Sequence, residues 1–366
     1  MKGNMAAIPQ PLNGTVRAIF KLHEDRRERT PRPYLGASEL GEPCARRLWL
    51  RFRWADVETF EGRMLRLFAT GDWVEGRLLE ELTAIGVRVD GKQWEVSAHG
   101  GHFSGHLDGA VLGLEEAPKT WHVFEAKSHN AKSFADLQKK GVRESKPRHW
   151  VQLQVYMGLT GMERAAYFAV NKDTDDILLE RVHFEPVEFK KLMERAGAII
   201  FTPEPPPKIS EDPSWFECKF CPFREQCHGT AAALPNCRTC AHSTPLNSGV
   251  WTCAQYGADI PLDVQREGCD EHRYLPRLVE NLLELVEAEG NVVTWRNKTN
   301  GALIRQPDYA SHEIHAATDK RFLGNEWIAS MKAEFPGTRV VPSERLPEVG
   351  EPKSDLPWMS VQVPAA

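Results

Sequence analysis

Seven of the eight cysteines in this chain lie between Cys218 and Cys269, in a run rich in Pro, Gly and Asn and poor in apolar residues. A segment of that composition cannot bury enough apolar surface to fold by the hydrophobic effect alone. Thiolates that bind an inorganic centre can supply the missing free energy of folding. We expect the chain to be cytoplasmic, where thiols stay reduced. Cysteines there are more often metal ligands than disulfides, so we also expect a metal-binding extension.

The whole chain has the composition of a globular protein. Its 366 residues are 41% hydrophobic and 27% charged, and at roughly 150 residues per domain this length predicts two or three units. A formal net charge of -5 rules out a uniformly basic nucleic-acid coat, but a local positive groove beside an acidic site is compatible with it. No stretch reaches the ~20 apolar residues that span a bilayer. Met1–Gly14 is expected to be neither a signal peptide nor an anchor, and no membrane partner is expected.

The first 230 residues alternate between helical and strand patterns. Apolar residues at helical spacing predict helices over residues 15–30, 38–54, 61–85, 146–160 and 187–200. Period-two patterns predict a meander over 87–123, a strand over 121–127, and a hairpin of 164–170 with 177–184. This order predicts an α/β domain over residues 15–230, with a mixed central sheet flanked by helices.

The rest of the chain is expected to form two smaller regions. Residues 231–275 hold the later cysteines and are expected to be a zinc-ribbon-like segment. Residues 276–366 are expected to be a small α+β region without a chemical signature. Its predicted elements are a helix over 276–289 that ends at Gly290, and a hairpin of 292–295 with 302–305.

Glu125-Ala126-Lys127 lies at the end of an apolar strand, where alternate residues point to the same face. The same Glu-x-Lys spacing occurs at Glu144–Lys146 and Glu188–Lys190, where it is typical of a solvated ion pair. The first copy differs because a second acid, Asp108, precedes it in the meander. Two acids on neighbouring strands can share Mg²⁺ or Mn²⁺, which polarises a phosphate and lowers the pKa of bound water.

Three further polar residues are candidates for the same site. Gln152 and Tyr156 are four apart on one predicted helix, so they share a face and can hydrogen-bond or pack beside the acids. The alternative is a polar residue on the helix surface with a tyrosine in the core. Glu75 could add a carboxylate from the helix over 61–85, or it could be a solvated helix acid.

The chain contains, in this order, Gly105-His106-Leu107-Asp108, Glu125-Ala126-Lys127 and Gln152-Leu153-Gln154-Val155-Tyr156. These resemble the GxxD, ExK and QxxxY motifs of RecB-family PD-(D/E)xK nucleases. The resemblance covers roughly residues 30–230 and implies a restriction-endonuclease-like core.

The resemblance also implies roles for individual residues. It implies that Asp108, Glu125 and the Ala126 carbonyl hold the divalent ion, with Lys127 serving the nucleophilic water. It implies that Gln152 and Tyr156 support the site and the DNA. Glu75 stands where many relatives have a histidine, although some phage recombination exonucleases of the wider superfamily use glutamate there.

Cys44 and a C-x2-C-x5-C group resemble the iron-sulfur staple of AddB-type helicase-nucleases and CRISPR-associated exonucleases. This implies one [4Fe-4S] cluster, held by Cys44, Cys218, Cys221 and Cys227. The alternative is a zinc knuckle made by the late trio with His228 or another cysteine, with Cys44 as a buried core thiol.

The remaining four cysteines can form a second complete site. Cys237 and Cys240 have zinc-knuckle spacing, and Cys253 resembles the second half of a zinc ribbon. With Cys269 they would bind a structural Zn²⁺, and His272 is a competing fourth ligand.

These features together predict a metal-dependent DNA exonuclease of phage or bacterial recombination or repair. Its expected substrate is DNA that is single-stranded or has free ends, and a recombination or annealing protein is an expected partner. The expected phosphate contacts are Arg26, Arg27, Arg46, Arg47, Lys146 and Arg148. Trp49, Trp54 or Trp150 could stack on unpaired bases, although tryptophans at these spacings are more often core residues. The alternatives are a non-catalytic DNA-binding accessory protein and a structure-specific endonuclease.

Overall fold

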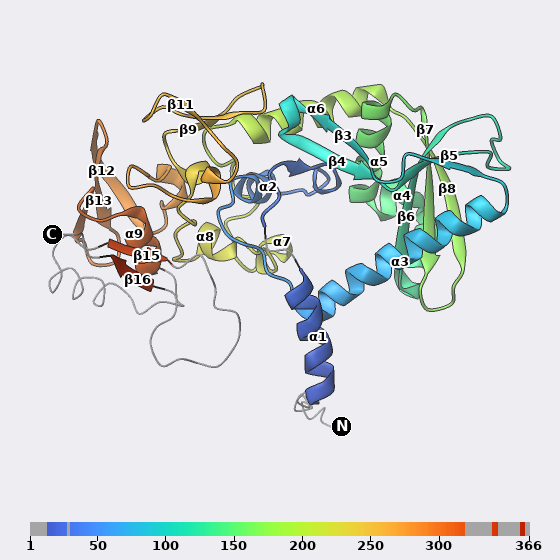
Figure 1. Ribbon diagram of the computed structural model, residues 1–366, viewed down its shortest axis with the longest axis horizontal. Helices are drawn as coiled ribbons and strands as arrows, with labels where there is room; N and C mark the ends of the chain where they lie inside the picture. The colour runs from blue at the N-terminus through green and yellow to red at the C-terminus, as the bar shows by residue number, and fades with distance from the viewer. Residues whose placement is uncertain (1–12, 28–29, 319–338, 343–358, 363–366) are drawn as a thin grey trace. The chain divides into compact units, whose positions relative to one another are not determined.

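The computed structural model describes residues 13–27, 30–318, 339–342 and 359–362 (Figure 1). The chain forms two compact units, each built from separate stretches of sequence. Unit 1 comprises Met1–Pro31, Glu58–Glu95 and His106–Glu185. Unit 2 comprises Arg32–Val57, Val96–Gly105 and Pro186–Ala366. Among the described residues, no helix has both the length and the apolar character needed to cross a membrane.

The centre of unit 1 is a five-stranded mixed sheet with the strand order β2-β5-β6-β7-β8. The strands are β2 (Arg88–Asp90), β5 (Gly109–Leu112), β6 (His122–His129), β7 (Arg164–Asn171) and β8 (Ile177–His183). Only β6 and β7 are parallel neighbours. Parallel neighbours need a crossover, which is supplied by α4 (Ala131–Ser145) and α5 (Pro147–Thr160). The prediction of a mixed α/β structure with helical cover is confirmed.

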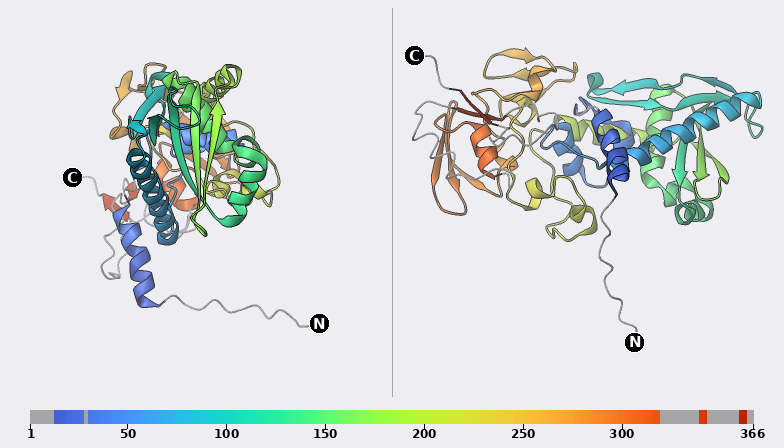
Figure 2. Two further views of the ribbon diagram at one scale, coloured as in Figure 1. Left: turned by 90° about the vertical axis from the view of Figure 1, so that its right-hand side faces the viewer. Right: turned by 60° about the horizontal axis from the view of Figure 1, so that its bottom comes forward.

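Strand alternation gives this sheet two chemically different faces. Phe124 and Ala126 of β6 belong to an apolar cluster with α3 (Gly62–Ala84). Since successive strand residues point to opposite faces, Glu125 and Lys127 lie on the other face, toward α5. Figure 2 shows the strands with α3 on one side and α4 on the other. The carboxylate pattern therefore lies away from the main apolar cluster.

The helices of unit 1 begin and end where local chemistry favours it. Asn13 caps α1 (Gly14–Arg26) by accepting a hydrogen bond from the backbone of Val16. Gly86 follows α3 with φ +90°, as predicted for a helix stop. At the crossing of α1 and α3, a Cβ on Gly62 would collide with the backbone of Phe20, so only glycine permits this close approach.

The described part of unit 2 contains helices and several small sheets. Its helices are α2 (Ala45–Phe52), α6 (Pro186–Phe201), α7 (Phe216–Lys219), α8 (Arg224–His228) and α9 (Ser311–Thr318). One sheet has the order β11-β10-β9, from β9 (Ser243–Pro245), β10 (Trp251–Cys253) and β11 (Ala258–Ile260). The next has the order β12-β13-β14, from β12 (Leu283–Glu289), β13 (Val292–Asn297) and β14 (Leu303–Gln306). The third is the pair β15 (Arg339–Pro342) and β16 (Met359–Gln362).

Three sequence predictions are wrong in detail. Residues 276–289 form a short 3-10 turn and the strand β12, not one helix, because Gly290 (φ +57°) and Asn291 form a two-residue turn that pairs Glu289 with Val292. The predicted 87–123 meander divides between two sheets. In one of these, β4 (Phe103–Leu107) lies between β1 (Leu35–Gly36) and β3 (Trp94–Ala98) and pairs with both. The helix predicted from residue 38 begins only at Ala45.

A glycine pair in unit 2 gives a test of the fold. Gly249 (φ +90°) lies against the backbone of Gly100, and a Cβ there would collide with it. Gly257 (φ +60°) has a similar backbone conformation but open space around it. We expect Gly257→Ala to cost about 1 kcal/mol from the left-handed conformation alone. Gly249→Ala adds a backbone clash, so we expect it to cost more than about 3 kcal/mol. Equal losses in chemical denaturation would contradict this packing.

Candidate active site

Four of the predicted site side chains, Asp108, Glu125, Lys127 and Gln152, are linked around the middle of β6. The Ala126 backbone N–H donates to Asp108 Oδ2 at 3.0 Å, which ties the residue preceding β5 to the middle of β6. Lys127 Nζ donates to Glu125 Oε1. Gln152 Nε2 of α5 donates to the same Oε1 at 2.9 Å. Strand register and one helix therefore fix the acids, the lysine and the glutamine together.

Glu125 is the most unusual group of the site. Its side chain is 0% exposed, and among the described residues its Oε2 has no hydrogen-bond partner. Burial raises its pKa to about 7, although the Lys127 cation opposes this shift. A buried carboxylate oxygen without a donor is costly. A divalent cation would be a suitable partner for it, because hard oxygen ligands suit Mg²⁺ and Mn²⁺.

Asp108 and Glu75 also have raised pKa values. Burial is the largest cause for Asp108, opposed by Lys127 and by the N–H of Ala126. For Glu75, burial comes first and repulsion from Asp108 second, while a hydrogen bond from Gln93 at 3.2 Å opposes them. The half-buried Glu75 of α3 is thus electrostatically coupled to the two strand acids, so it is not an isolated solvated acid.

The two α5 residues have different contacts. Gln152 contacts Glu125 directly, whereas the Tyr156 hydroxyl donates to the backbone oxygen of His106 at 2.8 Å. Both side chains are buried, so the alternative of a surface glutamine on this helix is wrong. Tyr156 holds the segment that leads into Asp108, two residues later, and supports the site through the backbone.

A buried histidine and tyrosine network next to Lys127 was missed in the sequence. The Tyr167 hydroxyl lies 3.0 Å from His129 Nε2 and 2.7 Å from His149 Nδ1. Burial, followed by nearby cations that include Lys127, lowers the pKa of His149 to about 3 and that of His129 to about 4. Both rings are therefore neutral at physiological pH. The alternation Glu125, Lys127, His129 along β6 was the signal available, since all three share one face.

The first cysteine set lies together in unit 2. Cys44 caps the start of α2, where its Sγ accepts from the Arg47 N–H at 3.4 Å. It lines one pocket with the late trio of Cys218, Cys221 and Cys227, and His228 lines the same pocket. Burial raises the pKa of all three late thiols, that of Cys227 to about 11. Cys44 is only half-buried, so it is not a separate core thiol.

The second set lines another pocket of unit 2. Its thiols are Cys237, Cys240, Cys253 and Cys269. Burial raises the pKa of Cys237 to about 12, and the neighbouring thiols add to this. His272 also lines the pocket, but its Nδ1 lies 2.8 Å from Ser311 Oγ and its Nε2 3.2 Å from Thr239 Oγ1. Both ring nitrogens of His272 are thus engaged within the protein.

The described residues do not form a closed metal-binding geometry. Within the part of the chain that the structure describes, no three His, Cys, Asp or Glu side chains are grouped so that they could hold an ion as they stand. Four thiols nevertheless line each of the two pockets, and Asp108 and Glu125 are electrostatically coupled neighbours.

Three of the basic residues predicted to bind DNA are engaged within the protein. Arg46 is buried and pairs with Glu280 at 2.9 Å, so its prediction as a phosphate contact is wrong. Arg47 pairs with Glu42 at 3.0 Å, and the Lys146 ammonium lies 3.7 Å from Asp136. The other three are exposed: Arg26, Arg27 and Arg148.

The predicted stacking tryptophans are core residues. Trp49 is 0%, Trp54 3% and Trp150 9% exposed. The indole N–H of Trp49 donates to the Thr202 carbonyl, and that of Trp54 to the Arg32 carbonyl. None of the three can stack on a base in this structure, so stacking is excluded and the core alternative is confirmed.

The raised pKa of Glu125 gives a pH-dependent prediction. A folded-state pKa above the unfolded value favours the folded state at low pH, and this contribution is lost as pH rises through about 7. We expect wild-type protein without divalent metal to lose more stability between pH 5 and pH 8 than Glu125→Gln does, by about 3 kcal/mol. Thermal unfolding at both pH values measures this. Glu144→Gln, on an exposed residue, should leave the pH dependence unchanged.

Comparison with known proteins found no matching protein-family model and no matching curated protein. The alkaline exonuclease LHK-Exo from Laribacter hongkongensis is a solved structure with 16% identity and a TM-score of 0.35, over 50% of this chain and 89% of that one. The solved protein SSO0001 has 15% identity and a TM-score of 0.35, over 58% and 95%. A phage-related exonuclease from Haemophilus somnus 129PT has 13% identity and a TM-score of 0.27, over 35% and 68%. Two of these three similar structures are thus exonucleases, and scores this low carry no argument about this chain.

Proposed function

We propose that this chain is a divalent-metal-dependent deoxyribonuclease that hydrolyses phosphodiester bonds at the site of Asp108, Glu125 and Lys127. The observation that carries the proposal is the fully buried Glu125, whose Oε2 has no partner among the described residues. A buried carboxylate that faces a second acid is costly unless a cation offsets both charges. The three motifs that resemble those of the RecB-family nucleases support the same conclusion.

Individual residues of the chain would have different roles in hydrolysis. Mg²⁺ or Mn²⁺, when bound, supplies Lewis acidity to the phosphate and lowers the pKa of water. Asp108, Glu125, the Ala126 carbonyl and Glu75 are the donors that would hold it. Gln152 keeps Glu125 in place through its hydrogen bond at 2.9 Å.

Lys127 is suited to bind negative charge rather than to remove a proton. Burial alone would lower its pKa, but the carboxylates of Glu125 and Asp108 outweigh burial and raise it. The side chain is 30% exposed, and we propose that its ammonium contacts a substrate phosphate as well as Glu125. The Lys127 ammonium would therefore orient the attacking water and stabilise the negative charge that develops on the phosphate oxygens.

DNA with free ends, or single-stranded DNA, is the proposed substrate, and exonucleolytic cleavage is the proposed mode. The motif resemblance supports both, as it supports a recombination or annealing protein as partner. The expected reduced state of the cysteines supports a cytoplasmic location. Arg26, Arg27 and Arg148 are the exposed basic side chains of unit 1 proposed to contact phosphates.

The two cysteine sets are proposed to bind inorganic centres. Four thiols line each pocket, and four thiolate donors suit either a [4Fe-4S] cluster or Zn²⁺. The resemblance to the iron-sulfur staple favours iron at the pocket of Cys44, and the zinc-ribbon spacing favours zinc at the pocket of Cys237. Each would stabilise a region with little apolar core.

Cleavage by active-site variants tests the proposed function. We expect Asp108→Ala, Glu125→Ala and Lys127→Met to lower the cleavage rate at least about 100-fold, with DNA binding nearly unchanged, because they remove charge at the reacting phosphate. Labelled single- and double-stranded DNA with Mg²⁺, Mn²⁺ or chelator gives the rates. Glu188→Ala and Lys190→Ala alter the same spacing on α6 and should cleave like the wild type.

The outcomes of this assay separate the alternatives. A wild-type protein that binds DNA but cuts none would favour the accessory-protein function. Cleavage of closed circular DNA would favour an endonuclease. Wild-type rates in the Asp108 and Glu125 variants would remove the proposed site.

Metal content tests the two cysteine sets. Anaerobically purified protein should be brown, absorb near about 400 nm and contain zinc as well as iron. Cys44→Ala should remove the iron and spare the zinc, while Cys253→Ala should do the reverse. Colourless protein with two zinc ions and no iron would overturn the cluster assignment.

A further inference from the structure

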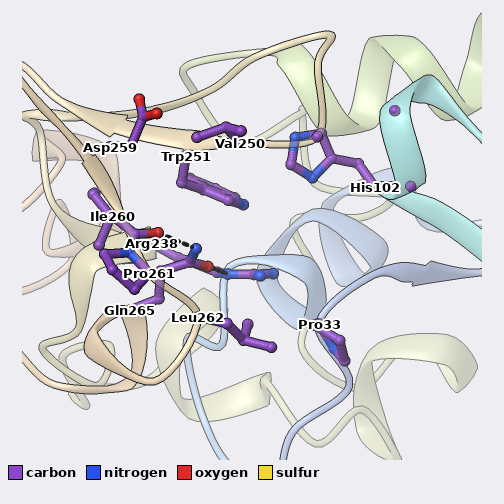
Figure 3. A pocket seen from close by; sticks show the side chains of 13 residues that line it. Pro33, His102, Arg238, Val250, Trp251, Asp259, Ile260, Pro261, Leu262 and Gln265 are labelled. Atoms are coloured by element: carbon purple, nitrogen blue, oxygen red, sulfur yellow. Dashed lines mark hydrogen bonds between the residues drawn. The ribbon is translucent and has the colours of Figure 1, made fainter.

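Unit 2 contains a pocket of about 440 Å³ that neither the carboxylates nor the cysteine sets explain (Figure 3). Its lining comes from Pro33, from residues 100–102, and from residues between Arg238 and Gln265. A volume of this size falls within the range of small-molecule sites. Trp251, Ile260 and Leu262 give it mostly apolar walls.

The charged group of this pocket is a buried guanidinium. Arg238 is 1% exposed, and its guanidinium carbon lies 3.7 Å from the centre of the Trp54 ring and 4.9 Å from that of Trp251. Figure 3 shows it in the pocket, hydrogen-bonded to Gln265. Its Nε donates to Gln265 at 2.9 Å and its Nη1 to the Phe52 carbonyl at 2.9 Å. A guanidinium has five N–H donors, so these two bonds leave others for a ligand.

A second buried arginine, Arg53, increases the positive charge around Arg238. Arg53 is 1% exposed and donates to the carbonyls of Arg238 and Thr202, both at 3.1 Å. Among the described residues its Nε has no partner, and neither arginine forms an ion pair with a carboxylate. The acid at the pocket, Asp259, is exposed. Two buried cations without a counter-ion are costly, and a bound anion would offset that cost.

We propose that this pocket binds a phosphate group, carried either by a mononucleotide or by a nucleic-acid strand, with Arg238 as its charge partner. The planar guanidinium matches phosphate oxygens in a two-bond geometry, and the Trp251 and Leu262 walls offer apolar surface to a base. This site lies in unit 2, so it does not depend on the nuclease proposal for unit 1.

Ligand binding to the full chain tests the site directly. The probes are inorganic phosphate, thymidine 5′-monophosphate, thymidine without phosphate, and a single-stranded oligothymidylate, titrated by calorimetry in buffer without divalent metal. Asp108→Ala is the background, so that the oligonucleotide is not cut. We expect the monophosphate to bind at one site, thymidine not to bind, and Arg238→Met to weaken binding at least tenfold. Displacement of the monophosphate by the oligonucleotide would identify the strand as the source of the phosphate, and lack of displacement would identify the free nucleotide.

A substitution at the rim of the pocket provides a second test of the proposal if Arg238→Met fails to fold. Leu262 lines the pocket and is 42% exposed, while Leu285 of β12 is 42% exposed and does not line it. We expect Leu262→Glu to weaken phosphate binding about tenfold by like-charge repulsion, and Leu285→Glu to leave it unchanged. Absence of binding by every phosphate probe, or equal effects of the two glutamates, would overturn the proposal.

Discussion

The arrangement of the unit 1 site depends on one buried carboxylate, that of Glu125. A fully buried acid is stable there only because Lys127 and Gln152 donate to the same oxygen. The parallel pairing of β6 with β7 and the crossover through α4 and α5 hold those donors in place. Glu125 Oε2 has no hydrogen-bond partner among the described residues, so this oxygen is available to bind a cation.

Much of unit 1 could be predicted because its signals are local. The 164–184 hairpin and the strand that carries Glu125 follow from period-two alternation, which fixes the face of each side chain. The Glu-x-Lys pattern had three copies, and the preceding Asp108 singled out the copy at Glu125. Its burial, in contrast with the exposed copy at Lys190, appears only in the structure. Burial depends on tertiary packing. The sequence could therefore identify Glu125 as a candidate site residue, but it could not show that its side chain is buried.

The failures have a common cause, which is pairing between distant residues. Arg46 looked like a phosphate contact, but its partner Glu280 is far along the chain and leaves no local pattern. Residues 283–289 have a spacing compatible with a helix, yet β13 recruits them into a sheet. Trp49 and Trp54 are held in the core by distant segments, since their indole N–H groups donate to the carbonyls of Thr202 and Arg32.

The interleaved construction of the two units has a consequence for synthesis on the ribosome. Unit 2 includes Cys44 at its start and Cys218 much later, with most of unit 1 made in between. At about 5–20 residues per second, the intervening chain takes roughly 10 s or longer to emerge. During that interval Cys44 has no thiol neighbours from its own set, so this set can be completed only after Cys227 has been synthesised.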